Sequence, residues 1–216
     1  MPAPDDEEND ERRDWPEGLV AVGGSLDPDS LLAAYCAGVF PWSSEPQITW
    51  WSPEPRVIFD LASWQPHRSV ARSARRAGWR FTTDRDFTGV MRACAAPAPN
   101  RESTWIGEDF IAAYTELHRR GYGHSVEVWE GDTLVGGIYG LAIGAFFGGE
   151  SMFHRRTDAS KAALAHLVTH LRTRGYELFD AQARNPHLMR LGAVAIPRQE
   201  YLQRLRRALK RRVTWS

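Results

Sequence analysis

Between Leu134 and Phe153 the chain alternates hydrophobic residues with glycines, and the stretch Ala142-Ile143-Gly144 interrupts this pattern with a turn signal. Alternation of this kind is typical of strands, and a glycine-containing break between two such runs is typical of a hairpin. The segment therefore predicts two antiparallel strands.

The next segment changes from the period of a strand to the period of a helix. Leu164, Leu167 and Leu171 recur at helical spacing, and Gly175 marks the end of the predicted helix. The apolar stretch Tyr176–Gln182 then predicts a short strand. A strand, a helix and a strand of these lengths form a crossover, so we expect the last strand to lie parallel to an earlier one.

The rest of the chain alternates between the same two patterns. This order predicts an α+β fold in which helices cover both faces of a mixed sheet, and it is similar to the order in GCN5-related acetyltransferases. We expect helices at Pro28–Ala37, Pro66–Ala77, Phe87–Ala95, Glu108–Arg120 and Arg198–Arg212, a short helix or turn at Asn185–Leu191, and further strands at Arg56–Leu61, Arg80–Thr83 and His124–Trp129.

Composition divides the chain into three parts. Residues 1–14 contain seven acids, two arginines and no apolar period, which predicts a disordered acidic tail. We interpret residues 15–62 as a small N-terminal α+β domain. Residues 63–216 then form the larger, acetyltransferase-like domain.

The whole chain has no net charge at neutral pH, so the acidic tail implies a basic remainder. Basic residues cluster in the second predicted helix and again between Arg204 and Arg212. Such clusters favour an anionic partner such as nucleic acid, although a solvated helix face has the same composition. In the second predicted helix the basic residues at helical spacing are Arg68, Arg72, Arg75 and Arg76.

Several features predict a cytoplasmic protein. Cys36 and Cys94 lack the spacing of a metal site, and we expect both to be buried free thiols in a reducing compartment. No apolar run is long enough to cross a membrane, and the acidic N-terminus is unlike a signal peptide. We expect no metal site, no membrane contact and a monomer.

Three polar residues stand in or beside apolar runs. Glu150 ends one run, and Asp180 and Gln182 are two residues apart, so a strand would direct both side chains to one face. A buried carboxylate is costly unless it is partnered or functional. Spacing alone leaves two interpretations open, a structural hydrogen bond at a strand end and a catalytic site.

Taken together, the segments resemble the leucyl/phenylalanyl-tRNA–protein transferases, in family order from about Gly18 to Ile196. No single string is decisive, but the ordered set is highly specific. The matching strings are GLVAVGGSLDPDSLLAAYCAGVFPW, WWSPEPR, TWI, GHSVEVW, LVGGIYG, GGESMF, ASKAAL, FDAQ and LGA.

The resemblance implies a function and a fold. Members of this family transfer leucine or phenylalanine from aminoacyl-tRNA to the N-terminal amine of proteins that begin with arginine or lysine, which marks those proteins for degradation. Methionine is expected to be a weak donor. The implied fold is an acetyltransferase-like catalytic domain that follows a small N-terminal domain, and the reaction uses no cofactor.

The resemblance also implies the reacting groups. It gives the family's key acid and amide as Asp180 and Gln182, and its site glutamate as Glu150. We expect Asp180 to be the acid–base residue and Gln182 to be its polar relay. Glu150 would meet the positive side chain of the acceptor or hold a loop. Ala181 stands where the family usually has cysteine, and Asp158 stands where asparagine is usual.

The donor would be held by aromatic and apolar residues. Trp42 and Trp105 fall on the family's nucleotide-site tryptophans and would stack on the terminal adenine. Ile138, Leu167 and Phe179 are the candidates for the apolar pocket that receives the amino-acid side chain, although each could be an ordinary core residue.

Two other functions remain open. A coenzyme-A acetyltransferase would share the expected fold, but the segment Met152–Asp158 contains no glycine with which to form the usual pyrophosphate loop. A non-catalytic RNA-binding module would use the arginines alone, and it would bind tRNA in a salt-dependent manner without transferring an amino acid.

Overall fold

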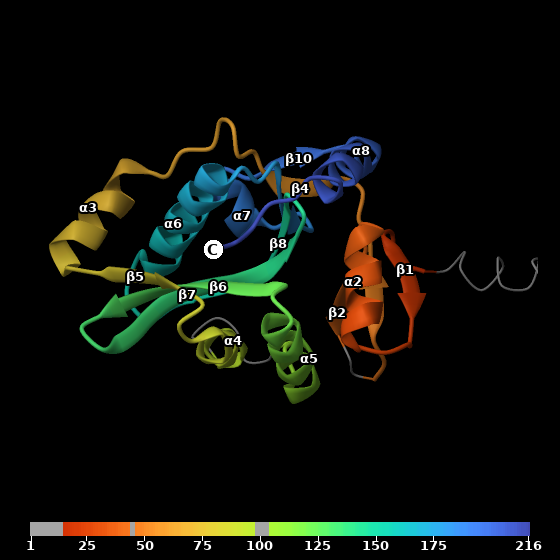
Figure 1. Ribbon diagram of the computed structural model, residues 1–216, viewed down its shortest axis with the longest axis horizontal. Coiled ribbons are helices and arrows are strands. Elements are labelled where there is room, and N and C mark those ends of the chain that lie inside the picture. The colour runs from red at the N-terminus through yellow and green to blue at the C-terminus, as the bar shows by residue number, and fades with distance from the viewer. Residues whose placement is uncertain (1–14, 44–45, 98–103) are drawn as a thin grey trace, which may run out of the picture.

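The computed structural model describes residues 15–43, 46–97 and 104–216. The predicted acidic tail at 1–14 and most of the loop after Pro97 lie outside the described residues. The described chain contains two sheets, one of three strands and one of seven (Figure 1).

The small sheet is antiparallel, with the strand order β1-β3-β2. Helix α2 packs beside it and begins as its sequence predicts, because the Asp27 side chain accepts hydrogen bonds from two backbone N–H groups and Pro28 occupies the first turn. The elements are β1 (Leu19–Val22), α2 (Pro28–Cys36), β2 (Phe40–Ser43) and β3 (Thr49–Trp51).

The large sheet has the order β10-β4-β9-β8-β7-β6-β5. Every neighbouring pair is antiparallel except β8 and β9, which are parallel, as expected for the crossover. Its strands are β4 (Arg56–Phe59), β5 (Arg80–Thr83), β6 (Gly123–Glu130), β7 (Thr133–Ile143), β8 (Phe146–His154), β9 (Leu178–Gln182) and β10 (Val194–Ile196).

Strand β4 joins the two parts of the chain. It lies within the predicted N-terminal domain, yet it pairs with β9 and β10 of the large sheet. The two sheets therefore divide between Trp51 and Arg56 and not at residue 62. The sequence pattern identified the strand but not its partner, because pairing is decided by contacts far apart in the chain.

Helices cover both faces of the large sheet, which confirms the predicted mixed α+β architecture (Figure 1). One hydrophobic cluster includes residues of α2, α4, α5 and α8, and the other includes α6. Cys36, expected to be buried, is exposed near the end of α2, whereas Cys94 is buried. The helices of the larger part are α3 (Arg68–Ala77), α4 (Phe87–Ala95), α5 (Glu108–Arg119), α6 (Ala159–Arg174), α7 (Pro186–Arg190) and α8 (Arg198–Leu209).

Strands β8 and β9 are paired over only a short length, and this leaves an opening in the sheet. Pairing begins at Phe146 with Leu178 and ends at Gly148 with Asp180. Beyond Gly148, β8 continues to His154 and pairs with β7 alone. The two strands therefore separate in the middle of the sheet, and the crossover helix α6 follows the longer strand.

Candidate active site

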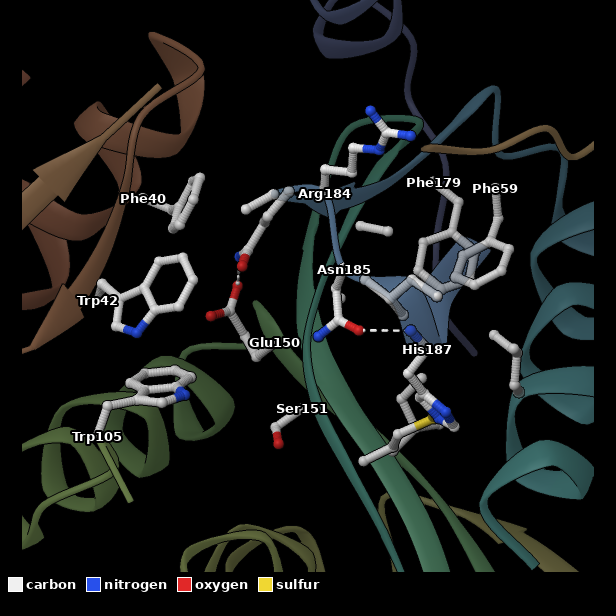
Figure 2. A pocket seen from close by; sticks show the side chains of 18 of the residues that line it. Phe40, Trp42, Phe59, Trp105, Glu150, Ser151, Phe179, Arg184, Asn185 and His187 are labelled. Atoms are coloured by element: carbon white, nitrogen blue, oxygen red, sulfur yellow. Dashed lines mark hydrogen bonds between the residues drawn. The ribbon is translucent and has the colours of Figure 1, made fainter. Parts of the chain in front are cut away.

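A cavity of about 370 Å³ opens where β8 and β9 separate (Figure 2). Aromatic rings from β2 and from the segment before α5 form one end, and apolar residues from β4, β7, α6 and β9 form the other. Polar side chains lie between the two ends. The lining includes Phe40, Trp42 and Trp105 at the aromatic end, Glu150 and Gln182 between the ends, and Phe59, Ile138, Met152, Leu164, Phe179 and Leu188 near the apolar end.

The aromatic end contains Trp42 and Trp105, the two tryptophans predicted to stack on the adenine. The Trp42 side chain is 45% exposed, and its ring lies 6.2 Å from the rings of Phe40 and Trp51. Trp105 is half-buried against Phe110, with its ring edge-on at 5.2 Å. Figure 2 shows the two indoles on the same side of Glu150. An exposed indole held by its neighbours offers a face on which a planar ring can stack.

The apolar end contains two of the three predicted pocket residues. Ile138 and Phe179 line it, and the Phe179 ring packs 5.1 Å from the ring of Phe59. Leu167 does not line the cavity, since it is buried in the cluster beneath α6. Leu164, one turn earlier on the same helix, lines the cavity instead.

Glu150 lies between the two ends and is held by three side chains. Tyr35 donates a hydrogen bond to Glu150 Oε1 at 2.7 Å, and the Gln182 amide donates to the same oxygen at 2.9 Å. The Tyr114 hydroxyl lies 3.4 Å from Oε2 and 2.5 Å from the Tyr35 hydroxyl. Oε1 is therefore occupied, whereas within residues 15–43, 46–97 and 104–216 Oε2 has one long contact, so it can accept a further hydrogen bond.

The surroundings of Glu150 change its protonation. Burial raises the pKa of its carboxyl group to about 7, although the hydrogen bonds from Tyr35 and Gln182 lower it in part. Burial is also the main reason that the pKa values of Tyr35 and Tyr114 lie well above the usual range. The tyrosines are therefore neutral donors, and Glu150 exchanges its proton near neutral pH.

Asp180 and Gln182 are linked, but only Gln182 lines the cavity. The strand pairing skips one residue between them, and Gln182 has a left-handed backbone with φ of 66°. Such a bulge redirects a side chain at the end of a strand. The backbone N–H of Gln182 donates to Asp180 Oδ1 at 2.8 Å, so the aspartate supports this conformation.

The side chain of Asp180 is completely buried against Arg56. The guanidinium donates from Nε to Oδ1 at 2.8 Å and from Nη2 to Oδ2 at 2.6 Å, and Tyr201 donates to Oδ2 at 3.0 Å. Arg56 also donates to the carbonyl of Gly38 at 3.0 Å, at the end of α2. Asp180 is thus a fully buried, hydrogen-bonded ion-pair partner of Arg56, and its side chain does not line the cavity.

The four arginines of α3 lie apart from the cavity. Arg68, Arg72, Arg75 and Arg76 are exposed, and none of them lines it. Helix α3 lies beyond α6, at the end of the molecule opposite to α2 (Figure 1). This geometry separates a site for a small chemical group from a surface suited to a large anionic partner.

Within residues 15–43, 46–97 and 104–216, no group of three or more histidine, cysteine, aspartate or glutamate side chains is arranged to hold a metal ion. No helix in the same ranges is long and apolar enough to cross a membrane.

Comparison with known proteins gives the family. The sequence model of the leucyl/phenylalanyl-tRNA protein transferases matches residues 58–206, and the model of their N-terminal domain matches residues 24–54. The leucyl/phenylalanyl-tRNA–protein transferase of Shewanella sp. (strain W3-18-1) is 51% identical over 191 residues, which cover 88% of this chain and 81% of that relative. The same-named protein of Shewanella piezotolerans is 50% identical over 192 residues, covering 88% of this chain and 81% of its own.

Solved structures show a weaker likeness. L-PGS from Bacillus licheniformis is 10% identical and has a TM-score of 0.47, over 89% of this chain and all of that chain. This likeness is too low to bear on function. The two family matches and the identity to the Shewanella proteins lead to one conclusion: the chain belongs to the leucyl/phenylalanyl-tRNA protein transferase family.

Proposed function

We propose that this protein transfers leucine or phenylalanine from aminoacyl-tRNA to the N-terminal α-amine of proteins that begin with arginine or lysine, and so marks them for degradation. One structural observation supports this proposal independently of family membership. A single cavity joins the exposed ring of Trp42 and the half-buried ring of Trp105 to an apolar end, and a carboxylate lies between them. This combination suits an aminoacyl-adenosine with an amine arriving beside it.

The donor end would occupy the full length of the cavity. The terminal adenine stacks on Trp42 and Trp105, and the leucine or phenylalanine side chain enters the apolar end between Leu164 and Phe179. An apolar pocket discriminates by fit, at roughly 1–3 kcal/mol per methylene. Methionine, which is unbranched, is therefore a poor but real donor, and side chains branched at Cβ are rejected more strongly.

The reaction is aminolysis of an ester. The neutral α-amine attacks the carbonyl carbon, a C–N bond forms, and the bond from the carbonyl carbon to the ribose oxygen breaks. A proton passes from the attacking nitrogen to the ribose oxygen, which leaves as a hydroxyl group. The ester is already activated, so the step needs no ATP or other cofactor, and alignment of the two reactants can supply much of the rate.

Glu150 and Gln182 are the residues that contact the amine in this proposal. Glu150 has a pKa of about 7, so it can accept the proton of an α-ammonium whose ordinary pKa is about 8. Its negative charge also favours an acceptor that carries a positive side chain. Asp180, predicted to be the acid–base residue, acts instead through Gln182, because Arg56 and Tyr201 already engage its carboxylate.

The fold assignment forms part of the proposal. A parallel pair of strands that separates in mid-sheet, followed by a crossover helix, favours an acetyltransferase-like domain. The turn before α6 favours a use other than coenzyme A binding, because residues 152–158 contain no glycine that could bring the backbone close to a pyrophosphate. We further propose a monomer that acts in the cytoplasm, where aminoacyl-tRNA is formed.

The test is a transfer assay. The protein is incubated with leucyl-tRNA and a peptide that begins with arginine, and the peptide is then weighed by mass spectrometry. We expect the mass to rise by one leucyl residue, with no gain on a peptide whose α-amine is acetylated. Binding of tRNA without transfer would favour the RNA-binding module, and acetylation from acetyl-CoA would favour the acetyltransferase.

A further inference from the structure

The wall of the apolar end belongs to a longer row of aromatic rings. Phe179 pairs with Phe59 of β4 on one side and with Phe147 of β8 on the other, so the three side chains are cross-strand neighbours on one face of the large sheet. The ring centroids of Phe59 and Phe179 are 5.1 Å apart, and those of Phe179 and Phe147 are 5.5 Å apart. Phe59 and Phe179 line the cavity (Figure 2), whereas Phe147 does not.

A tryptophan closes each end of this row. The Trp64 ring lies edge-on to Phe59 at 5.9 Å, and the Trp215 ring stacks on Phe147 at 5.6 Å. The two tryptophans are 8% and 7% exposed, and neither lines the cavity. We call Trp64, Phe59, Phe179, Phe147 and Trp215 the aromatic row. Its outer members are connected to the cavity through the rings between them.

Both tryptophans are anchored by other elements. Trp215 lies in the C-terminal segment, between α6 and the large sheet (Figure 1). Its ring stacks on His124 of β6 at 4.4 Å and lies 4.3 Å from the ring of His170 of α6. Trp64 Nε1 donates a hydrogen bond to the carbonyl of Leu191 at 2.7 Å. The two ends of the aromatic row are therefore fixed by contacts outside the cavity.

We propose that Trp64 and Trp215 are positioning residues that set the size of the apolar end, and with it the preference between leucine and phenylalanine. This inference rests on the proposed function. Because protein interiors are close-packed, Phe59 and Phe179 can move away from the cavity only if the rings beside them give way. Truncating either tryptophan leaves a space into which the aromatic row can relax, and this deepens the apolar end.

The experiment measures the ratio of phenylalanine to leucine transferred when the two charged tRNAs compete in one reaction. This ratio does not depend on the amount of folded enzyme, so a variant that is only less stable keeps the wild-type value. The test variants are Trp64→Ala and Trp215→Ala. The matched control is Trp129→Ala, because Trp129 is 7% exposed, lies on β6, and belongs neither to the aromatic row nor to the cavity lining.

Both test variants should raise the ratio of phenylalanine to leucine by about fivefold or more, since one methylene in an apolar pocket is worth roughly 10–200-fold in discrimination. Trp129→Ala should keep the wild-type ratio. Trp215→Phe should stay close to the wild type, because a phenyl ring still packs on Phe147. Leucine variants at positions 64 and 215 remove less packing than alanine, and they repeat the test if an alanine variant does not fold.

A double-variant cycle tests whether Trp215 acts through Phe147. Adding Trp215→Ala to the Phe147→Leu variant should change the ratio less than Trp215→Ala changes it in the wild type, because the connecting ring is already lost. Equal changes in the two backgrounds would mean that Trp215 does not act through Phe147.

An unchanged ratio in the folded alanine or leucine variant of either tryptophan would overturn the inference for that end of the aromatic row. An equal rise of the ratio in Trp129→Ala would overturn it for both ends, because any loss of buried aromatic packing would then loosen the pocket. Failure of the proposed function looks different, because the wild type itself would then transfer neither amino acid.

Discussion

The guanidinium of Arg56 and the carboxylate of Asp180 form two parallel hydrogen bonds in the interior of the protein, and neither side chain has any exposed surface. The two residues are 124 positions apart in the chain. Arg56 also binds the Gly38 carbonyl, and Asp180 also binds the backbone of Gln182. This pair therefore connects the end of α2 to the strand that carries a proposed reacting group.

The first prediction concerns the stability that this pair provides. Arg56→Met should lower the free energy of unfolding by about 3–5 kcal/mol, because it leaves the Asp180 carboxylate buried and uncompensated. Urea unfolding followed by circular dichroism measures the loss. In the double variant Arg56→Met/Asp180→Leu, which removes both charges, most of the stability should return but transfer should not. A single variant as stable as the wild type would contradict the account.

The second prediction concerns the pH dependence of transfer. Because the pKa of Glu150 is raised to about 7, the carboxylate form is lost as the pH falls through 7. Transfer by the wild type should therefore decline below pH 7, by about tenfold per pH unit. Glu150→Gln should transfer about a hundredfold more slowly at pH 8, and its rate should follow only the deprotonation of the acceptor amine, whose ordinary pKa is about 8, with no further change of slope near pH 7. Both proteins are assayed with the same acceptor peptide, so its amine titrates identically in the two pH–rate profiles. Any difference between the profiles is then due to Glu150. Profiles of the same shape would exclude it as the proton acceptor.

The third prediction separates the stacking residues from other tryptophans. Trp42→Ala and Trp105→Ala should each weaken the binding of phenylalanyl-adenosine by about 1–3 kcal/mol, since each removes one platform for the adenine. Trp79→Ala provides the control, because Trp79 is half-buried and does not line the cavity. Isothermal titration calorimetry measures all three. Equal effects at Trp42, Trp105 and Trp79 would mean that general stability, not stacking, was lost.

The fourth prediction compares two leucines on one helix. Leu164 lines the cavity and Leu167 does not, although both are buried. Either change to alanine should cost about 2–5 kcal/mol of stability. Only Leu164→Ala should alter the ratio of phenylalanine to leucine transferred, because only it reshapes the apolar end. Competition between the two charged tRNAs in one reaction measures the ratio. A changed ratio in Leu167→Ala alone would place the pocket one turn further along α6.

The fifth prediction concerns α3. Arg72→Gln/Arg76→Gln should weaken the binding of intact aminoacyl-tRNA and lower its salt slope by about 2, close to one for each lost phosphate contact. Fluorescence anisotropy at several salt concentrations measures the slope. A slope equal to that of the wild type would mean that this face of α3 is only solvated.

Much of the fold follows from local pattern. The helices α4 and α6, the strand β5 and the hairpin of β7 and β8 occupy the segments whose periodicity predicts them. Strand β10 was not predicted, since three residues are too few to establish an alternation. Strand β4 was recognised but assigned to the smaller part, because its pairing with β9 depends on residues more than a hundred positions away.

The site could be predicted only in part, and the missing residues have a common feature. Three residues from distant elements form hydrogen bonds to the site carboxylates: Tyr35 and Tyr114 to Glu150, and Arg56 to Asp180. Their local sequence does not indicate these contacts. Tyr35 and Arg56 each stand within one of the family strings, but that alone does not reveal their partners. In each case the contact is created by packing between elements and not by any spacing along the chain.

Leu167 shows a second limit of periodicity. Helical spacing identifies the face of α6 that packs on the sheet, but not the level at which the sheet opens. Strands β8 and β9 separate beyond Gly148 and Asp180, so the opening meets the first turns of α6, where Leu164 lies. Leu167 lies one turn further along α6, where the two strands are paired, and it is buried in the hydrophobic core.

The mode of inhibition by phenylalanyl-adenosine tests whether one cavity holds the donor's aminoacyl-adenosine. Initial rates of leucyl transfer are measured against leucyl-tRNA at several concentrations of this ligand, with free adenosine as the control. We expect competitive inhibition that is much stronger than inhibition by adenosine, because contacts at the apolar end add to the stacking. Absence of competition would mean that recognition lies in the body of the tRNA, and the cavity between β8 and β9 would not be the donor site.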